Sequence, residues 1–253
     1  MRLHLREWGD GPIVVCLHGV TSFGGRFRKL AQERLADFRV LAPDLRGHGR
    51  SEIEPPWDLG TIVDDVLETV PAGPAVWIGH SYGGRIVLEI GARAPEGVER
   101  VVLLDPALQV LPHVALDMAE GACAHLSFAS PEEAIQSRID SGRYLHTPRA
   151  FFEEDAREHL EAGPDGRLRF RFCRSAVVTA WSDMATPPPL APRVPTLLVL
   201  GAQSWLVLDE QVEELRARLG ELLQVVTVPG GHTVFWDAFA ETADAVDAFL
   251  REG

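Results

Sequence analysis

Positive charge and cysteine are both scarce in this chain. Lys29 is the only lysine, and 24 lysine and arginine residues stand against 37 aspartate and glutamate residues, for a formal net charge of −13. Nucleic acids and anionic membranes are bound by clustered cations, so this balance argues against both as partners. The three cysteines are too few and too scattered for a disulfide framework, and none forms a C-x-x-C pair.

Long apolar runs are missing as well. No segment is long enough to span a bilayer, and residues 1–8 lack the apolar centre of a signal peptide, so we expect a cytoplasmic protein. Clusters of His, Cys and Asp with metal-ligand spacing are absent, and the glycine-rich residues 44–51 lack the lysine of a phosphate cradle. We therefore expect no metal and no cofactor. Nothing in the sequence indicates the oligomeric state.

Six short, nearly continuous apolar runs are typical of strands buried on both faces of a parallel sheet. Helical patterns separate most of them, and this alternation predicts a doubly wound, mostly parallel α/β sheet that binds ligands at the carboxyl ends of its strands. Residues 3–8 predict an antiparallel edge strand. The predicted central strands are 13–17, 39–42, 75–78, 101–104, 196–200 and 224–228, and the predicted helices are 26–36, 61–70, 82–92, 209–219 and 236–250.

The alternation breaks in the middle of the chain. Residues 107–192 have a mainly helical pattern and end in a proline-rich stretch, which predicts an inserted cap of about four helices between the two parts of the core, 1–106 and 193–253. Within it, residues 167–172 alternate polar and apolar side chains like a short strand. Their arginines (Arg167, Arg169, Arg171) could contact an anionic substrate, although a solvated strand face is favoured. The cap histidines (His113, His125, His146, His159) are expected to be mostly solvated.

The segment Gly79-His80-Ser81-Tyr82-Gly83 lies between an apolar strand pattern and a helical pattern. A serine on so sharp a turn, with glycine two residues to each side, is the nucleophile-elbow pattern. The turn raises the hydroxyl above the sheet and directs a helix N-terminus at developing negative charge. A serine that only caps the following helix is the weaker alternative.

Four motifs in this order make the chain resemble the α/β-hydrolase family over essentially its full length. His18-Gly19-Val20-Thr21 is similar to the oxyanion loop, residues 44–51 to the D-x-R-G-x-G-x-S loop of capped members, residues 79–83 to the elbow, and Gly231-His232 to the segment with the catalytic histidine. The resemblance implies a serine esterase or lactonase with a helical cap. It further implies Ser81 as nucleophile, His232 as general base, and the N–H groups of Val20 and Tyr82 as oxyanion hole.

The acid of the expected triad departs from the family pattern. Most members carry an aspartate where this chain has Ser204, and a serine cannot supply the carboxylate that orients the imidazole. Asp105, at the end of the preceding predicted strand, is the favoured replacement, since some similar members carry their acid there. Asp209 is the alternative, although Asp209-Glu210 is also typical of a solvated helix start.

These features predict a hydrolase that cleaves a small to medium, largely apolar carboxylic ester through an acyl-enzyme. An aspartate nucleophile, as used on alkyl halides and epoxides, is excluded by Ser81. Lactonase, thioesterase and carbon–carbon bond hydrolase remain as alternatives of the same fold, and a non-catalytic ligand-binding protein as an alternative of another class. Trp205 and Trp181 are candidate substrate contacts.

Overall fold

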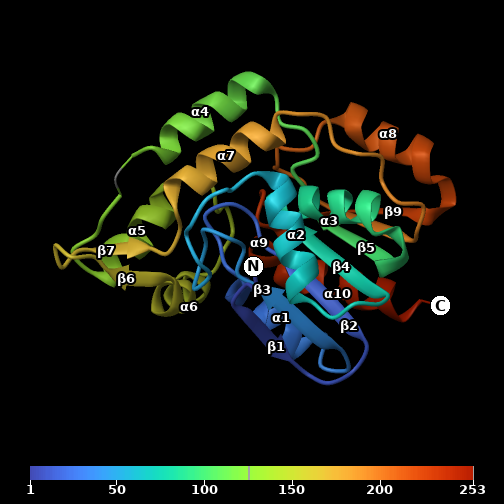
Figure 1. The fold of residues 1–253 in the computed structure, drawn as a ribbon, viewed down its shortest axis with the longest axis horizontal. Helices are drawn as coiled ribbons and strands as arrows, with labels where there is room; N and C mark the ends of the chain where they lie inside the picture. Colours follow the sequence, from blue (N-terminus) through green and yellow to red (C-terminus); the bar gives the residue numbers. More distant parts are fainter. Residues whose placement is uncertain (125, 253) are drawn as a thin grey trace.

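The computed structural model describes residues 1–124 and 126–252, in which a seven-stranded sheet has helices on both faces (Figure 1). The strand order is β1-β3-β2-β4-β5-β8-β9, with β1 antiparallel to β3 and every other neighbouring pair parallel. The predicted mostly parallel α/β fold is thereby confirmed. The strands of this sheet are β1 (Leu5–Trp8), β2 (Ile13–Leu17), β3 (Arg39–Pro43), β4 (Ala75–His80), β5 (Val98–Leu104), β8 (Thr196–Gly201) and β9 (Leu223–Val228).

The helices follow the predicted pattern, with two differences. In chain order they are α1 (Arg28–Glu33), α2 (Leu59–Thr69), α3 (Tyr82–Arg93), α4 (Pro112–Ala122), α5 (Pro131–Asp140), α6 (Arg149–His159), α7 (Arg174–Met184), α8 (Asp209–Leu219), α9 (Val234–Asp237) and α10 (Phe239–Arg251), with 3-10 turns η1 (Gly24–Phe27), η2 (Pro95–Gly97) and η3 (Gly220–Leu222).

The two differences concern the helices that follow β2 and β9. The predicted helix 26–36 is a 3-10 turn followed by a shorter α-helix. The predicted helix 236–250 is broken at Ala238, which is non-helical with φ −133° and ψ 62°. The break lets Asp237 turn back and accept a hydrogen bond from the Gly231 amide (2.8 Å), which helps to hold the loop before His232.

Alternate residues of the central strands enter two separate apolar cores. In β2, Val15 and Leu17 belong to the core that includes side chains of α2, α3 and α8, whereas Val14 and Cys16 belong to the core that includes α1 and α10. Both faces of the strand are therefore buried, which explains why its sequence is continuously apolar rather than alternating.

The region between β5 and β8 contains α4 to α7 and a two-stranded sheet, β6 (Leu160–Ala162) and β7 (Leu168–Phe170). Figure 1 shows these elements together along the left-hand side of the view, from α4 at the top to α6 below. The short strand expected in residues 167–172 is confirmed by β7. The assignment of residues 107–192 to a separate cap subdomain stays a prediction.

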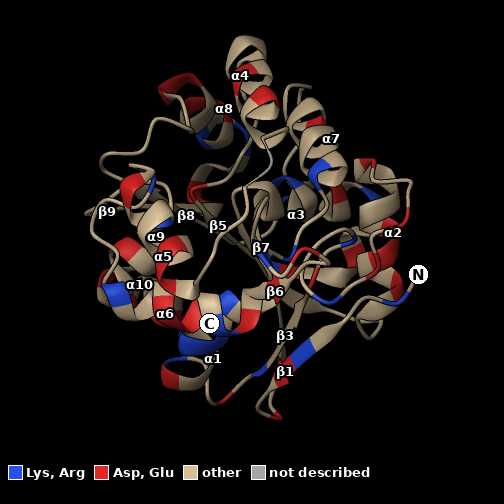
Figure 2. Cartoon of the chain, turned by 90° about the vertical axis from the view of Figure 1, so that its left-hand side faces the viewer, with Lys and Arg blue, Asp and Glu red and all other residues tan. Residues whose placement is uncertain are grey.

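Charged side chains of this region are largely paired. Arg169 binds Asp165 and Arg171 lies near Glu161, so these two arginines belong to a solvated surface, while Arg167 bonds Ser127. Figure 2 shows acidic residues spread over the outer helices among basic ones. In the described residues no helix is long and apolar enough to cross a membrane.

His113 and His146 are exposed, as expected of most cap histidines, and His159 is the exception. Its side chain is fully buried, stacked on Phe23 with ring centroids 4.6 Å apart, because α6 packs its inner face onto the core. His125 lies outside the described residues.

Candidate active site

Ser81 forms the turn between β4 and α3 in a conformation that non-glycine residues seldom adopt, with φ 55° and ψ −119°. The glycines around it have no room for a side chain. A Cβ atom on Gly79 would lie 2.4 Å from the Gly83 carbonyl oxygen, and one on Gly83 would lie 2.0 Å from the Leu17 carbonyl oxygen. The elbow is thus tightened against the end of β2, and strain of this kind is typical of functional sites.

The loop after β2 lies directly against Ser81. A Cβ atom on Gly19 would lie 2.8 Å from the Ser81 Cβ and 3.3 Å from its Oγ. His18 fixes this loop, because its Nε2 accepts from the Leu45 amide (2.9 Å) and its Nδ1 donates to the Gly19 carbonyl (2.8 Å). Burial holds the pKa of His18 well below its usual value, so the ring is neutral at neutral pH. The predicted donor Val20 follows Gly19 on this loop.

Asp105 and His232 lie in direct contact. The Nδ1 of His232 donates to Oδ2 of Asp105 over 2.6 Å, and Asp105 is completely buried at the end of β5 with a positive φ of 41°. This bond fixes the proton on Nδ1 and leaves Nε2, the atom a general base uses, free to accept. In the described residues, no hydrogen bond joins His232 to Ser81.

Ser204 contacts the same carboxylate oxygen of Asp105 as His232 does. Its Oγ donates to Oδ2 of Asp105 over 2.6 Å, and the Gly201 amide donates to Oδ1 over 3.3 Å. The family's usual acid position therefore holds a hydroxyl that contacts the acid from the neighbouring strand. Asp209, the alternative acid, is exposed at the start of α8 and makes no hydrogen bond to His232 in the described part of the chain.

His80 joins the elbow to the loop of His232. Its Nε2 bonds the His232 carbonyl oxygen (3.1 Å), and the two rings lie 4.7 Å apart. Burial, together with the nearby His232, holds the pKa of His80 well below its usual value, so this ring acts as a neutral donor.

The two candidate substrate tryptophans lie in different surroundings. Trp205 follows Ser204 and is 58% exposed, whereas Trp181 of α7 is 7% exposed within an apolar core. Contact of either residue with substrate stays a prediction. Among the described residues, no group of three His, Cys, Asp or Glu side chains could hold a metal ion.

The sequence profile of the alpha/beta hydrolase family matches residues 14–245, which is most of the chain and includes the elbow, Asp105 and His232. The chain belongs to the alpha/beta hydrolase family. Lipase LipV of Mycobacterium tuberculosis is 31% identical to this hydrolase over 240 residues, covering 92% of this chain and 91% of the lipase. The 2-(acetamidomethylene)succinate hydrolase of Mesorhizobium japonicum is 30% identical over 251 residues, covering 90% of this chain and 84% of that enzyme.

Solved structures of this family have the same fold. The crystal structure of E-2-(acetamidomethylene)succinate hydrolase is similar to this hydrolase with a TM-score of 0.87 and 26% identity, over 99% of this chain and 95% of that one. Its near-complete coverage includes the region between β5 and β8. That region is therefore present in a solved relative and is not peculiar to this chain.

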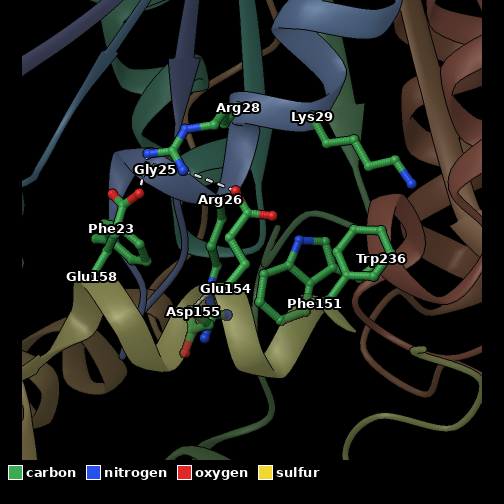
Figure 3. Close-up of a pocket in the computed structure, with 10 residues that line it drawn as sticks. All are labelled: Phe23, Gly25, Arg26, Arg28, Lys29, Phe151, Glu154, Asp155, Glu158 and Trp236. Carbon is green, nitrogen blue, oxygen red and sulfur yellow. Dashed lines mark hydrogen bonds and ion pairs between the residues drawn. The ribbon is translucent and has the colours of Figure 1, made fainter. Parts of the chain in front are cut away.

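Sequence analysis missed a buried polar cluster beside the site. Arg26 of η1 reaches Asp155 of α6, as Figure 3 shows, and Arg138 and Tyr144 lie near the same carboxylate. Arg26 and Asp155 are 129 positions apart, and neither belongs to a motif. A sequence signal was available only in the amphipathic pattern of α6, whose inner face carries an aspartate and a histidine.

Proposed function

We propose that this hydrolase is a serine esterase with Ser81 as nucleophile, His232 as general base and Asp105 as the acid that orients His232. The observation that carries the proposal is the 2.6 Å contact between Asp105 and His232, beside a strained serine elbow. The lipase name of a relative that covers nearly the whole chain supports an ester as the substrate class.

In the first step, Ser81 Oγ attacks the ester carbonyl carbon while Nε2 of His232 takes its proton. The proton then passes to the alcohol oxygen as the ester C–O bond breaks, leaving an acyl group on Ser81. In the second step, His232 deprotonates a water that attacks this acyl group and returns the proton to Ser81. Asp105 stays ionised and stabilises the imidazolium in both steps.

The oxyanion of each tetrahedral intermediate needs fixed donors. The Tyr82 amide is the first N–H of α3, and the first N–H groups of a helix have no partner within it. The Val20 amide lies on the loop that Gly19 holds against Ser81. Losing one such donor costs about 3 to 4 kcal/mol of activation free energy in serine hydrolases.

The competing functions differ in what supports them. A ligand-binding protein without catalysis would be expected if the site had no acid, but Asp105 supplies a carboxylate in contact with His232. Lactones, thioesters and activated carbon–carbon bonds would use the same residues. The triad geometry does not distinguish these substrates from simple esters, so they must be compared by measuring the rate at which the protein hydrolyses each class.

The proposal is tested by hydrolysis of p-nitrophenyl acyl esters of graded chain length, with the Ser81→Ala variant beside the unaltered protein. We expect turnover that falls at least 10³-fold in the variant, together with labelling of Ser81 by a fluorophosphonate detected by peptide mass spectrometry. Turnover that persists in Ser81→Ala, or labelling at another serine, would refute the proposed nucleophile.

A further inference from the structure

The carboxylate of Asp237 joins the loop that carries His232 to the region between β5 and β8. Its Oδ2 accepts hydrogen bonds from the Gly231 amide (2.8 Å) and from the Leu145 amide (3.3 Å), and its Oδ1 accepts one from the Thr147 hydroxyl. Leu145 and Thr147 lie between α5 and α6, and Thr147 precedes Asp237 by 90 positions. One side chain therefore holds two segments that are far apart in the sequence.

His146, the residue between Leu145 and Thr147, makes a second link. Its Nε2 donates to Oε1 of Gln203 over 2.9 Å, and the Gln203 amide donates to the carbonyl oxygen of Gly230 over 2.9 Å. Each of the consecutive residues 145–147, here called the support segment, therefore bonds to Gln203 or to Asp237.

Packing also confines the residue that precedes His232. A Cβ atom on Gly201, at the end of β8, would lie 2.1 Å from the Gly231 carbonyl oxygen. A Cβ atom on Gly231 itself would lie 3.2 Å from Leu145 Cδ1 and 3.3 Å from Asp237 Oδ2. Both β8 and the support segment therefore touch the backbone from which His232 extends.

The placement of the His232 ring relative to Ser81 depends on that backbone. Asp105 holds Nδ1 of the ring, but in the described residues no hydrogen bond joins His232 to Ser81, and the His232 side chain is 33% exposed. His80 bonds the carbonyl oxygen of His232, and Asp237 bonds the amide of the residue before it. A displacement of about 1 Å between reacting groups can lower a rate about 100-fold.

We propose that Asp237 and Thr147 are positioning residues for His232, so that the support segment sets the place of the general base without touching a reacting atom. This inference rests on the proposed function. The alternative is that these bonds only fasten the region between β5 and β8 to the core. In that case their removal would lower the melting temperature and leave the turnover of the folded protein unchanged.

The first test removes the carboxylate of Asp237. Hydrolysis of the best p-nitrophenyl ester is measured well below the melting temperature of each variant. Asp237→Ala leaves the Gly231 amide without its acceptor, and we expect kcat to fall about 30-fold with KM nearly unchanged. In Asp237→Asn, the amide oxygen can still accept from Gly231 and Leu145, and the Thr147 hydroxyl can accept from the NH2 group, so kcat should fall at most about threefold.

Thr147→Val tests the support segment itself, because it removes a hydroxyl and keeps the shape of the side chain. We expect kcat to fall about fivefold with KM nearly unchanged. In the Asp237→Ala background, the same replacement should lower kcat no further, because Thr147 acts through the carboxylate that is already missing.

Two control variants make matched changes elsewhere in the same region. Thr179→Val removes a hydroxyl that donates to the Ser175 carbonyl oxygen within α7, and Glu154→Ala removes a carboxylate that joins α6 to Arg28 of α1. Both should keep kcat within about twofold of that of the unaltered protein. An Asp237→Ala protein that keeps more than about a third of kcat, or an equal loss in Glu154→Ala, would overturn the positioning role.

Nuclear magnetic resonance separates failure of the positioning role from failure of the esterase. Isotopically labelled histidine gives an imidazole Cε1–H signal for each ring, and the signal of His232 is assigned by its absence in His232→Gln. If the unaltered protein hydrolyses no ester, a His232 signal that moves in Asp237→Ala and Thr147→Val, but not in the two controls, supports the positioning role although the proposed function fails. A signal that does not move in Asp237→Ala refutes it.

Discussion

Replacing Asp105 by asparagine tests the part of the site in which this chain departs from its family's usual pattern. Asparagine has nearly the same shape but carries no charge. If its NH2 group takes the place of Oδ2, the atom that both Ser204 and His232 contact, it donates to His232 and favours the tautomer with Nδ1 unprotonated and Nε2 protonated, so that Nε2 can no longer accept a proton. Because the carboxylate is completely buried and bonds His232 over 2.6 Å, no solvent compensates for its loss. The same replacement in serine proteases lowers kcat about 10⁴-fold, equivalent to about 5 kcal/mol of activation free energy.

The assay is steady-state hydrolysis of the best p-nitrophenyl ester by the unaltered protein, Asp105→Asn and Asp209→Asn. We expect a loss of about 10⁴-fold for Asp105→Asn and less than twofold for Asp209→Asn, since Asp209 is exposed. Circular dichroism melting of each variant separates loss of catalysis from loss of folding. An Asp105→Asn protein that melts normally and keeps more than a tenth of the activity would refute the assignment, as would a 100-fold loss in Asp209→Asn.

Three further predictions concern the surroundings of the triad. Ser204→Ala removes one of three hydrogen bonds to the Asp105 carboxylate, and we expect kcat to fall about three- to tenfold with KM unchanged; an unaltered kcat would contradict a positioning role. Gly19→Ala places a Cβ atom 2.8 Å from that of Ser81 and should lower kcat/KM at least 100-fold in a protein that still folds. Burial lowers the pKa of His48 to about 4, so between about pH 6.5 and 4 the unfolded chain binds a proton that the folded chain does not. The free energy of unfolding should therefore decrease as the pH is lowered through this window, by up to about 3 kcal/mol from His48 alone. This decrease, measured by urea unfolding, should be smaller in the His48→Asn variant.

The sheet could be predicted well because local signals and tertiary position agree there. The strands around β2 and β4 are buried on both faces, so their apolar runs are unbroken, and the glycines at 79 and 83 mark a turn that no other residue fits. Asp105 was preferred over Asp209 from its place at a strand end, and that place brings it to His232.

Features made by contacts between distant segments could not be predicted. The pairing of Arg26 with Asp155 depends on how α6 lies on η1, and the burial of His159 has the same cause. The break at Ala238 accompanies the bond between Asp237 and the Gly231 amide, and helical periodicity encodes neither. The contacts of Asp155 and His159 are set by packing across the junction between the core and the region from β5 to β8.

The junction between the core and the region from β5 to β8 determines how this region could be exchanged between members of the fold. The chain leaves the sheet after β5 and re-enters it at the adjacent β8, so a chimaera could receive a foreign segment in place of 112–184 without altering Asp105, Ser204 or the register of either strand. Such a transplant would, however, remove Asp155 and leave the charged Arg26 buried against the foreign segment. The chimaera would fold well only if the foreign segment places a carboxylate beside Arg26, or if Arg26 is replaced by an apolar residue at the same time.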